Sequence, residues 1–256
     1  MDFKIVIPAR YGASRLPGKP LRELAGWPLV RHVHARAVES GAEVVIATDD
    51  ERIRDACVGF GAEVSMTATE HESGTARIAE VVAQRGWPDD AIVVNLQGDE
   101  PLVPPQLLRD VAVDLADHLT ADVTTLATPI ESGDDLANPN VVKVVTDAAG
   151  FALYFSRAPV PWDRDRFATA GGVAAAGPGP AHQRHVGLYA YRAGYLRHYV
   201  TLAPSPLESI ESLEQLRVLW HGGRIHVSRA SVPPGHGVDT EADLARVATL
   251  LAASGP

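Results

Sequence analysis

Short apolar runs alternate with helix-like patterns through the first half of the chain. The runs of strand length are 4–7, 44–48, 63–66 and 92–96. Apolar residues recur at helical spacing over 28–39, 50–60, 74–84 and 104–118. Strands that alternate with helices predict a parallel sheet with helices on both faces. In such sheets ligands bind beyond the carboxyl ends of the strands, where the loops after residues 7, 48 and 96 should converge.

The pattern changes after residue 120. Strand-like runs follow one another at 123–130, 141–145, 151–155 and 186–191 without long helices between them. This predicts a mixed or antiparallel extension of the sheet. A helix is expected around 212–221, a strand at 225–228 and a last helix after Asp239, while the Gly- and Ala-rich tract 171–180 reads as a flexible loop.

The predicted fold class is therefore α/β. We expect a three-layer α/β/α, Rossmann-like arrangement with a mostly parallel sheet and a smaller mixed β extension. Residues 1–256 are expected to form a single domain. Within it, 1–120 would bind the nucleotide, 121–230 would serve acceptor binding and dimerisation, and 231–256 would supply a metal-site turn and the C-terminal helix.

Composition excludes several classes of protein. The net charge of −9 argues against nucleic-acid binding, which needs a basic face. The longest apolar runs are strand length and far below the roughly 20 residues that span a bilayer, so no membrane association is expected. The chain enters a strand at Phe3 without a secretory signal, and its single cysteine, Cys57, precludes an internal disulfide. A cytoplasmic protein is expected, with Cys57 as a small core residue.

The loop after the first strand has an unusual charge. Residues 1–22 contain five cations, Lys4, Arg10, Arg15, Lys19 and Arg22, against one acid, Asp2. Cations and bare backbone amides at the end of a strand favour a phosphate site. The alternative is a solvated polar turn, but Pro17, Gly18 and Pro20 make this loop stiffer than a connector needs to be.

This loop matches neither common nucleotide-binding motif. Five residues separate Gly12 from Gly18 and Pro20 follows Lys19, whereas a P-loop has four residues between its glycines and a Ser or Thr after the lysine. No G-x-G-x-x-G follows the first strand.

Two aspartates are candidates for a metal site. Asp99 follows a buried strand and Gly98, a residue that permits close approach of the backbone. One or two carboxylates together with phosphate oxygens suffice for Mg²⁺. Asp239 precedes the last helix, and its functional role requires that it face Asp99. The alternatives are an N-cap acid for the helix after Pro104 and an ordinary capped helix start.

Many short motifs in one order resemble the 3-deoxy-manno-octulosonate (Kdo) cytidylyltransferase family, also called CMP-Kdo synthetases, within the nucleotide-diphospho-sugar transferase-like fold. The matching segments are 7–11, 14–20, 47–49, 73–75, 95–101, 138–143, 155–157, 161–165, 184–189, 211–217 and 237–240. The resemblance covers nearly the whole chain. It implies Mg²⁺-dependent transfer of CMP from CTP to Kdo with release of pyrophosphate.

The resemblance also implies roles for individual residues. The catalytic set would be Arg10, Lys19, Asp99 and Asp239, with Asp99 and Asp239 as the metal ligands. The nucleotide would be bound by Pro8, Ala9, Arg10, Arg15, Lys19, Ser73 and Arg77. The acceptor acid would be bound by Gln97, Arg157, Arg164, His185, Tyr189, Glu214 and Gln215. A homodimer is a further expectation of this family, with 155–165 and the flanking strands as the interface.

Other interpretations remain for the acceptor residues. His185 and Tyr189 are four apart on a predicted strand and could be a core pair. Glu214 and Gln215 could lie on a solvated helix face, and Arg164 could pair with the acids around it. Ala76 departs from the family pattern, which has an acid between Thr75 and Arg77.

Two other functions are compatible with this fold. The same cytidylyl transfer could use another small acid such as a phosphonate (phosphonoformate), and a non-catalytic nucleotide-binding module could keep the fold without turnover. The presence of Lys19, Asp99 and Asp239 argues against the second.

Overall fold

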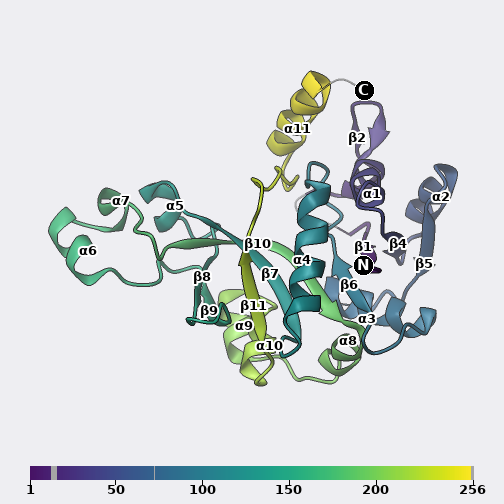
Figure 1. Ribbon diagram of the computed structural model, residues 1–256. Helices are drawn as coiled ribbons and strands as arrows, with labels where there is room; N and C mark the ends of the chain where they lie inside the picture. The colour runs from purple at the N-terminus through teal and green to yellow at the C-terminus, as the bar shows by residue number, and fades with distance from the viewer. Residues whose placement is uncertain (13–15, 72, 255–256) are drawn as a thin grey trace.

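One sheet runs through the molecule, and its first half is parallel (Figure 1). This computed structural model describes residues 1–12, 16–71 and 73–254. The order β6-β1-β4-β5 is parallel throughout. These strands are β1 (Lys4–Pro8), β4 (Glu43–Thr48), β5 (Glu63–Met66) and β6 (Ile92–Asn95). The parallel half predicted from the sequence is confirmed.

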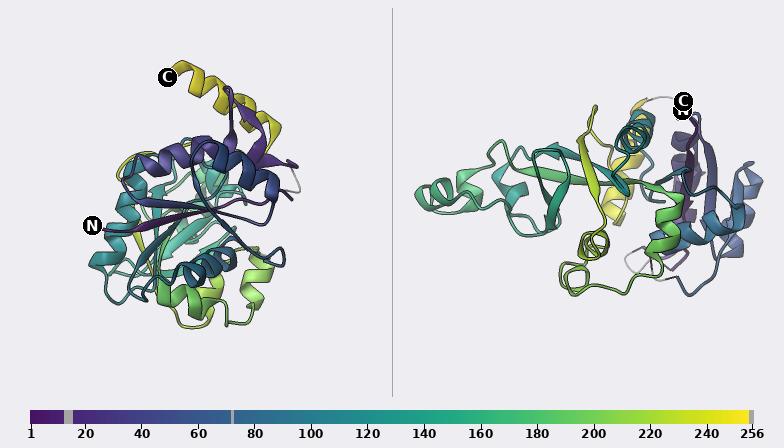
Figure 2. Two further views of the ribbon diagram at one scale, coloured as in Figure 1. Left: turned by 90° about the vertical axis from the view of Figure 1, so that its right-hand side faces the viewer. Right: turned by 60° about the horizontal axis from the view of Figure 1, so that its bottom comes forward.

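Helices cover both faces of this sheet, which explains why its strands are apolar without alternation (Figure 2). Ile5 and Ile7 of β1 share one core cluster with buried residues of α1 (Leu29–Val38), α2 (Glu51–Gly59) and α4 (Pro105–Asp117). Val6 points to the other face and joins buried residues of α3 (Gly74–Arg85), α8 (Ala193–Tyr199) and α10 (Leu216–Trp220). The three-layer α/β/α prediction is confirmed, and α8 is a helix that the sequence pattern did not reveal.

The second half of the sheet is mixed, as predicted. The long strand β10 (Gln183–Arg192) is antiparallel to β6 and to β7 (Val123–Pro129), and β11 (Ile225–Arg229) is parallel to β7. The N-terminal end of β10 also pairs with β8 (Lys143–Thr146), which pairs with β9 (Ala152–Ser156). The strand β10 therefore joins the main sheet to an outlying arm.

The arm carries three short helices, α5 (Gly133–Ala137), α6 (Arg164–Ala170) and α7 (Val173–Ala176) (Figures 1 and 2). The prediction that 171–180 is a loop throughout was wrong, because α7 lies within it. Alanines favour helix, and flanking Gly172 and Gly177 adopt positive φ and end the segment on both sides. Val173 and Ala176 pack against the buried Phe167 in a small core of their own.

Two short helices stand where the sequence predicts one helix over 212–221, and only the second of them lies within that range. The first is α9 (Pro206–Glu211), which Ser205 and Glu208 open with a capping box, and the second is α10. Ser212 adopts a left-handed conformation with φ 50° and ends α9, so the predicted helix began four residues too early.

The last helix lies beside the first loop. The segment after β1 contains the 3-10 helix η1 (Lys19–Leu21) and a hairpin of β2 (Glu23–Leu24) and β3 (Trp27–Pro28). Val247 of α11 (Glu241–Ser254) and Leu24 belong to the same buried cluster. Arg22 also forms an ion pair with Glu241 at 2.7 Å. Residues more than 200 positions apart therefore meet here.

Cys57 is buried within a core cluster of the sheet face, as predicted. Among the described residues, the helices are all too short or too polar to cross a membrane.

Candidate active site

The carboxyl ends of β1 and β6 approach each other closely. A Cβ atom on Gly98 would lie 2.8 Å from the carbonyl oxygen of Pro8, which is too close for any side chain. The expectation that Gly98 permits close backbone approach is thus confirmed. It allows the segment after β6 to bring Asp99 beside the loop that follows β1.

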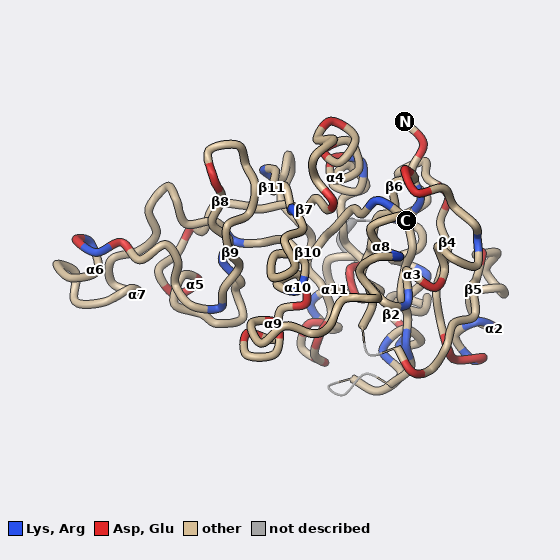
Figure 3. Tube along the Cα trace, turned by 90° about the horizontal axis from the view of Figure 1, so that it is seen from below, with Lys and Arg blue, Asp and Glu red and all other residues tan. Residues whose placement is uncertain are grey.

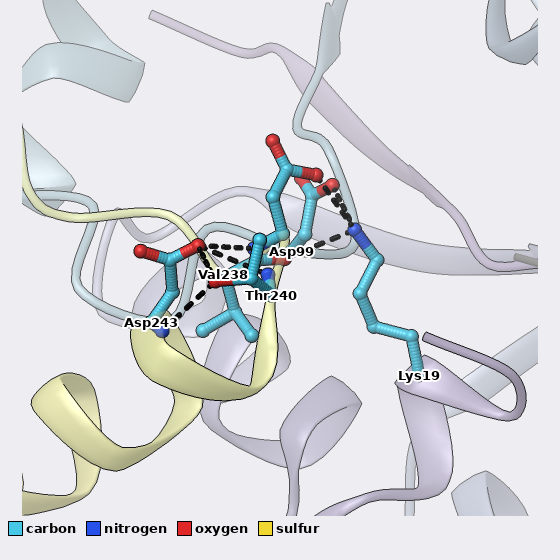
Figure 4. Close-up of polar contacts among 6 residues, drawn as sticks. Lys19, Asp99, Val238, Thr240 and Asp243 are labelled. Atoms are coloured by element: carbon cyan, nitrogen blue, oxygen red, sulfur yellow. Dashed lines mark hydrogen bonds and ion pairs between the residues drawn. The ribbon is translucent and has the colours of Figure 1, made fainter. Parts of the chain in front are cut away.

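Lys19 joins the first loop to both candidate metal ligands (Figure 4). Its Nζ donates to Asp99 Oδ2 at 2.7 Å, to the carbonyl oxygen of Val238 at 3.0 Å and to Asp239 Oδ1 at 3.3 Å. Asp239 therefore faces Asp99 across one ammonium group, as its functional role requires. Three segments that are distant in sequence meet at this point.

Local sequence determines how each member of this cluster is presented. Gly18 has φ 65°, a conformation that favours glycine, and it starts η1 at Lys19. On the other side, Thr240 and Asp243 form reciprocal capping hydrogen bonds at the start of α11. The Thr240 cap holds Asp239 just before the helix, so the capped helix start and the functional placement of Asp239 coexist.

The electrostatics of the cluster follow from its charges. Burial lowers the pKa of Lys19, but the ion pairs with Asp99 and Asp239 outweigh it, so the pKa is raised and the ammonium stays charged. Burial, and then repulsion from Asp99 and Asp239, raises the pKa of Glu100 to about 8. The site therefore has a negative potential that a cation would relieve.

Three cavities meet at Gln97. The first, of about 450 Å³, is lined by Arg10, Ser73 and Glu214 among others. The second, of about 270 Å³, is lined by Arg10, Lys19, Asp99 and Asp239, and the third, of about 340 Å³, by Glu100, His185 and Asp239. Gln97 lines all three. This arrangement gives room for two ligands, one on each side of Gln97.

Most of the residues predicted to bind the nucleotide line the first two cavities. Pro8, Ala9 and Arg10 line both, and Ser73 and Arg77 line the first. Ser73 caps α3 by accepting from the Ala76 amide at 3.1 Å. Arg77 is 2% exposed, and its guanidinium donates to Asp49 Oδ2 at 2.8 Å and to Thr67. Arg15 lies outside the described residues.

Two of the predicted acceptor residues line these cavities, Glu214 the first and His185 the third, and both occupy packed positions. The His185 ring lies 5.3 Å from that of Tyr189, and its Nε2 is 3.0 Å from Thr125 Oγ1. Glu214 Oε1 accepts from the Tyr199 hydroxyl at 3.1 Å. Gln215 is 7% exposed at the start of α10, so the alternative of a solvated helix face does not hold for it.

The two arginines predicted to bind the acceptor acid lie apart from the other residues predicted to bind it. Arg157 donates to the backbone oxygens of Glu211, Pro139 and Ser212, so it ties loops together. Arg164 is exposed on α6 at the far end of the arm, where acidic and basic residues alternate (Figure 3). Arg164 is not among the residues that line the three cavities.

The family model described as Cytidylyltransferase matches residues 4–225, which is most of the chain. The chain belongs to the cytidylyltransferase family. It is 60% identical over 252 residues to the 3-deoxy-manno-octulosonate cytidylyltransferase of Halorhodospira halophila, with 97% of this chain and 96% of that protein covered. It is 55% identical to the enzyme of the same name from Idiomarina loihiensis, with 98% of each chain covered. The resemblance drawn from the sequence motifs is confirmed.

Solved structures agree with this membership in the cytidylyltransferase family. The structure of a CMP:2-keto-3-deoxy-manno-octonic acid synthetase complexed with CTP superposes with a TM-score of 0.88 at 41% identity, covering 99% of this chain and 100% of that one. A nucleotidyl transferase from Methanothermobacter thermautotroptrophicus has a TM-score of 0.60 at 18% identity and shares the fold. The predicted fold class and enzyme class are confirmed.

Sequence reasoning missed several charged residues that line the cytidylyltransferase cavities. Arg217 donates two hydrogen bonds to the carboxylate of Glu208, at 2.8 and 2.6 Å, and both residues line the first cavity. His71 lies 2.5 Å from Glu80 and lines the same cavity. Glu208 and Arg217 are nine residues apart across the unpredicted turn at Ser212, so helical spacing could not have paired them.

A second group of possible metal ligands lies at the opposite end of the sheet. His226 Nδ1 is 2.8 Å and His118 Nδ1 is 3.2 Å from the carboxylate oxygens of Asp114. The two imidazole rings are stacked, with centroids 3.6 Å apart and planes 18° apart. Nearly parallel rings direct their nitrogen lone pairs side by side rather than at one point, so this arrangement fits hydrogen bonding to Asp114 better than a shared ion.

Proposed function

We propose that this chain transfers CMP from CTP to Kdo, with Mg²⁺ as the metal, and releases pyrophosphate. The observation that carries the proposal is the convergence of Lys19, Asp99 and Asp239 beside two cavities that meet at Gln97. Relatives that are 54–60% identical over nearly the full chain have the name of this activity, which supports the assignment.

The nucleotide would lie across the ends of β1 and α3. Arg10 and Lys19 supply positive charge to the second cavity, where the triphosphate would fit. The first cavity extends from Arg10 to Ser73 at the N-terminus of α3 and has room for the nucleoside. Arg77, which is buried against Asp49, would act by holding this helix in position rather than by direct contact.

The residues present fit a magnesium ion. Asp99 and Asp239 place carboxylate oxygens within 3.3 Å of a single point, the Lys19 nitrogen, and Mg²⁺ prefers one or two carboxylates with phosphate oxygens. We therefore propose Asp99 and Asp239 as its ligands. When bound, the ion would polarise the α-phosphate and lower the pKa of the attacking hydroxyl.

The acceptor would lie beside Gln97, between Glu214 of the first cavity and His185 of the third, with Tyr189 and Gln215 next to them. Burial lowers the pKa of His185 to about 3, so its imidazole is neutral and suited to hydrogen bonds with hydroxyl groups. Gln97 lies between the two ligands and lines all three cavities, so we propose that it orients the sugar acid toward the nucleotide.

In the reaction, the anomeric hydroxyl oxygen of Kdo attacks the α-phosphorus and the bond to the bridging oxygen of pyrophosphate breaks. The hydroxyl loses its proton to solvent, and negative charge builds up on the leaving pyrophosphate. Arg10 and Lys19 would stabilise that charge as the phosphates separate. Positioning and electrostatic stabilisation supply the rate without a dedicated base on this chain.

We also propose a homodimer, formed through the region that contains β8 and β9. Leu153 and Trp162 are 62% and 63% exposed there, which is high for large apolar side chains. Leu153 lines a groove of about 760 Å³ together with residues such as Val144, Val160 and Val227. A second copy of the chain would cover this apolar surface.

The reaction is tested by pyrophosphate release from CTP and Mg²⁺ with Kdo, sialic acid and phosphonoformate as separate acceptors. We expect release with Kdo, and we expect Asp99→Asn and Asp239→Asn to reduce it to background while far-UV circular dichroism is unchanged. Release with phosphonoformate and none with Kdo would show that the acceptor assignment is wrong. No release with any acceptor would favour a binding module.

A further inference from the structure

Lys19 uses all of its hydrogen-bonding capacity on the proposed metal site. An ammonium group has three N–H donors, and Lys19 directs them to Asp99, Val238 and Asp239 at 2.7, 3.0 and 3.3 Å. Its side chain is 16% exposed, whereas that of Asp239 is 56% exposed. The lysine is thus held inside the cluster, and the carboxylates surround it as they would surround a cation.

This arrangement does not allow Lys19 and Mg²⁺ to bind Asp99 and Asp239 at the same time. The same Asp99 and Asp239 oxygens are the proposed Mg²⁺ ligands, and Mg²⁺ needs oxygen atoms at about 2.0–2.1 Å. An ammonium 2.7 Å from Asp99 Oδ2 occupies the space between the two carboxylates and repels a divalent cation. Both cations cannot occupy this position together.

The side chain of Lys19 can leave while its backbone stays in place. The Lys19 amide donates to the Leu16 oxygen at 3.1 Å, the Leu21 amide donates to the Gly18 oxygen at 2.9 Å, and Pro20 is buried. Only the four-carbon stem needs to rotate. Lys19 and Arg10 line the same 270 Å³ cavity, so phosphate groups entering it would meet the ammonium there.

We propose that Lys19 is an internal counter-ion of Asp99 and Asp239, and that the phosphates of the nucleotide must draw it away before these carboxylates can bind the metal. This inference rests on the proposed function. Once Lys19 leaves, Asp99 and Asp239 have no cation between them and repel each other, which favours a divalent cation in its place. Nucleotide and metal therefore bind cooperatively, and the coupling is reciprocal.

The test is Mn²⁺ binding to the full-length protein without nucleotide, measured from the electron paramagnetic resonance signal of free Mn²⁺. We expect Lys19→Met and Lys19→Gln to bind Mn²⁺ about 10-fold more tightly than the unmodified protein, because they remove the competing charge. Lys19→Arg retains a cation and should bind as weakly as the unmodified protein. Lys4→Met is the matched control, since it removes a lysine that pairs with Asp2 and Glu43 instead.

A second measurement adds a CTP analogue with a methylene group between the α- and β-phosphorus atoms. The analogue should tighten Mn²⁺ binding by the unmodified protein more than by Lys19→Met, because the variant has no ammonium to displace. Equal tightening in both would overturn the inference.

Asp99→Asn separates failure of this inference from failure of the proposed function. If Asp99→Asn weakens Mn²⁺ binding and Lys19→Met does not strengthen it, the counter-ion role is wrong and the metal site stands. If Asp99→Asn leaves Mn²⁺ binding unchanged, the metal assignment and the counter-ion role are both wrong.

Discussion

At the scale of the residue, His185 shows how packing decides the chemistry of a side chain. Its ring lies 5.0 Å from that of Phe155 and 5.3 Å from that of Tyr189, and its Nε2 is next to Thr125 Oγ1. Burial lowers its pKa to about 3. The core-pair interpretation and the ligand interpretation of His185 and Tyr189 are therefore compatible, because a packed pair can present one edge to a cavity.

The low pKa of His185 predicts a pH dependence of stability. Its pKa is below the ordinary value of about 6.5 in the folded state, so the unfolded chain binds the proton more tightly and stability falls as pH drops from 6.5 toward 3. Between pH 6.5 and 5, this residue should account for a loss of about 2 kcal/mol. Urea unfolding of the unmodified protein and of His185→Gln at both pH values measures it. Parallel losses in the two proteins would contradict the prediction.

At the scale of the element, α3 is tied to the end of β4 by a buried ion pair. Arg77 and Asp49 are 3% and 17% exposed at the side chain and lie 2.8 Å apart. The family resemblance implied that Arg77 binds the nucleotide. The structure shows that Arg77 also forms an ion pair with Asp49, which lies 28 residues earlier in the chain. A buried charge needs such a partner, and spacing along the chain does not reveal it.

Breaking this pair should be costly. We expect Arg77→Met to lower the free energy of unfolding by about 3–5 kcal/mol, because Asp49 would keep a charge without its counter-ion. Adding Asp49→Asn to this variant should restore part of the loss. Urea unfolding followed by circular dichroism measures both, with Arg54→Met in an exposed ion pair as the control. An identical loss in the single and double variants would contradict the coupling.

The arm and the α9–α10 segment contain short helices whose bounds the sequence pattern did not predict. Long helices with clear periodicity, such as α3 and α4, were located within about two residues of their bounds. The short helices α5, α7 and α9 were not, because four to six residues carry too little periodic pattern to be recognised. Their stability depends on caps such as Ser205 and on packing such as that of Val173 against Phe167.

At the scale of the whole molecule, the proposed homodimer depends on an exposed apolar surface. The family resemblance implied an interface at 155–165 and the flanking strands, where the structure exposes Leu153 and Trp162.

The dimer can be tested by light scattering after gel filtration. We expect a mass of twice the chain's 27.2 kDa, and Leu153→Asp should shift it toward a single chain by placing a charge in an apolar interface. Leu119→Asp is the matched control, since Leu119 is 82% exposed on a different loop. A dimer that persists in Leu153→Asp would move the interface elsewhere.

The sequence by itself determined the alternating α/β order, the parallel first half of the sheet, the cationic first loop and the motifs of the family. These depend on local apolar spacing and on residue types, which can be read along the chain. Only the tertiary structure decided that Lys19 lies between Asp99 and Asp239, that Arg77 pairs with Asp49 and that Arg164 lines none of the three cavities. Such contacts join residues tens to hundreds of positions apart, and they follow from how the strands and loops pack, which no local pattern encodes.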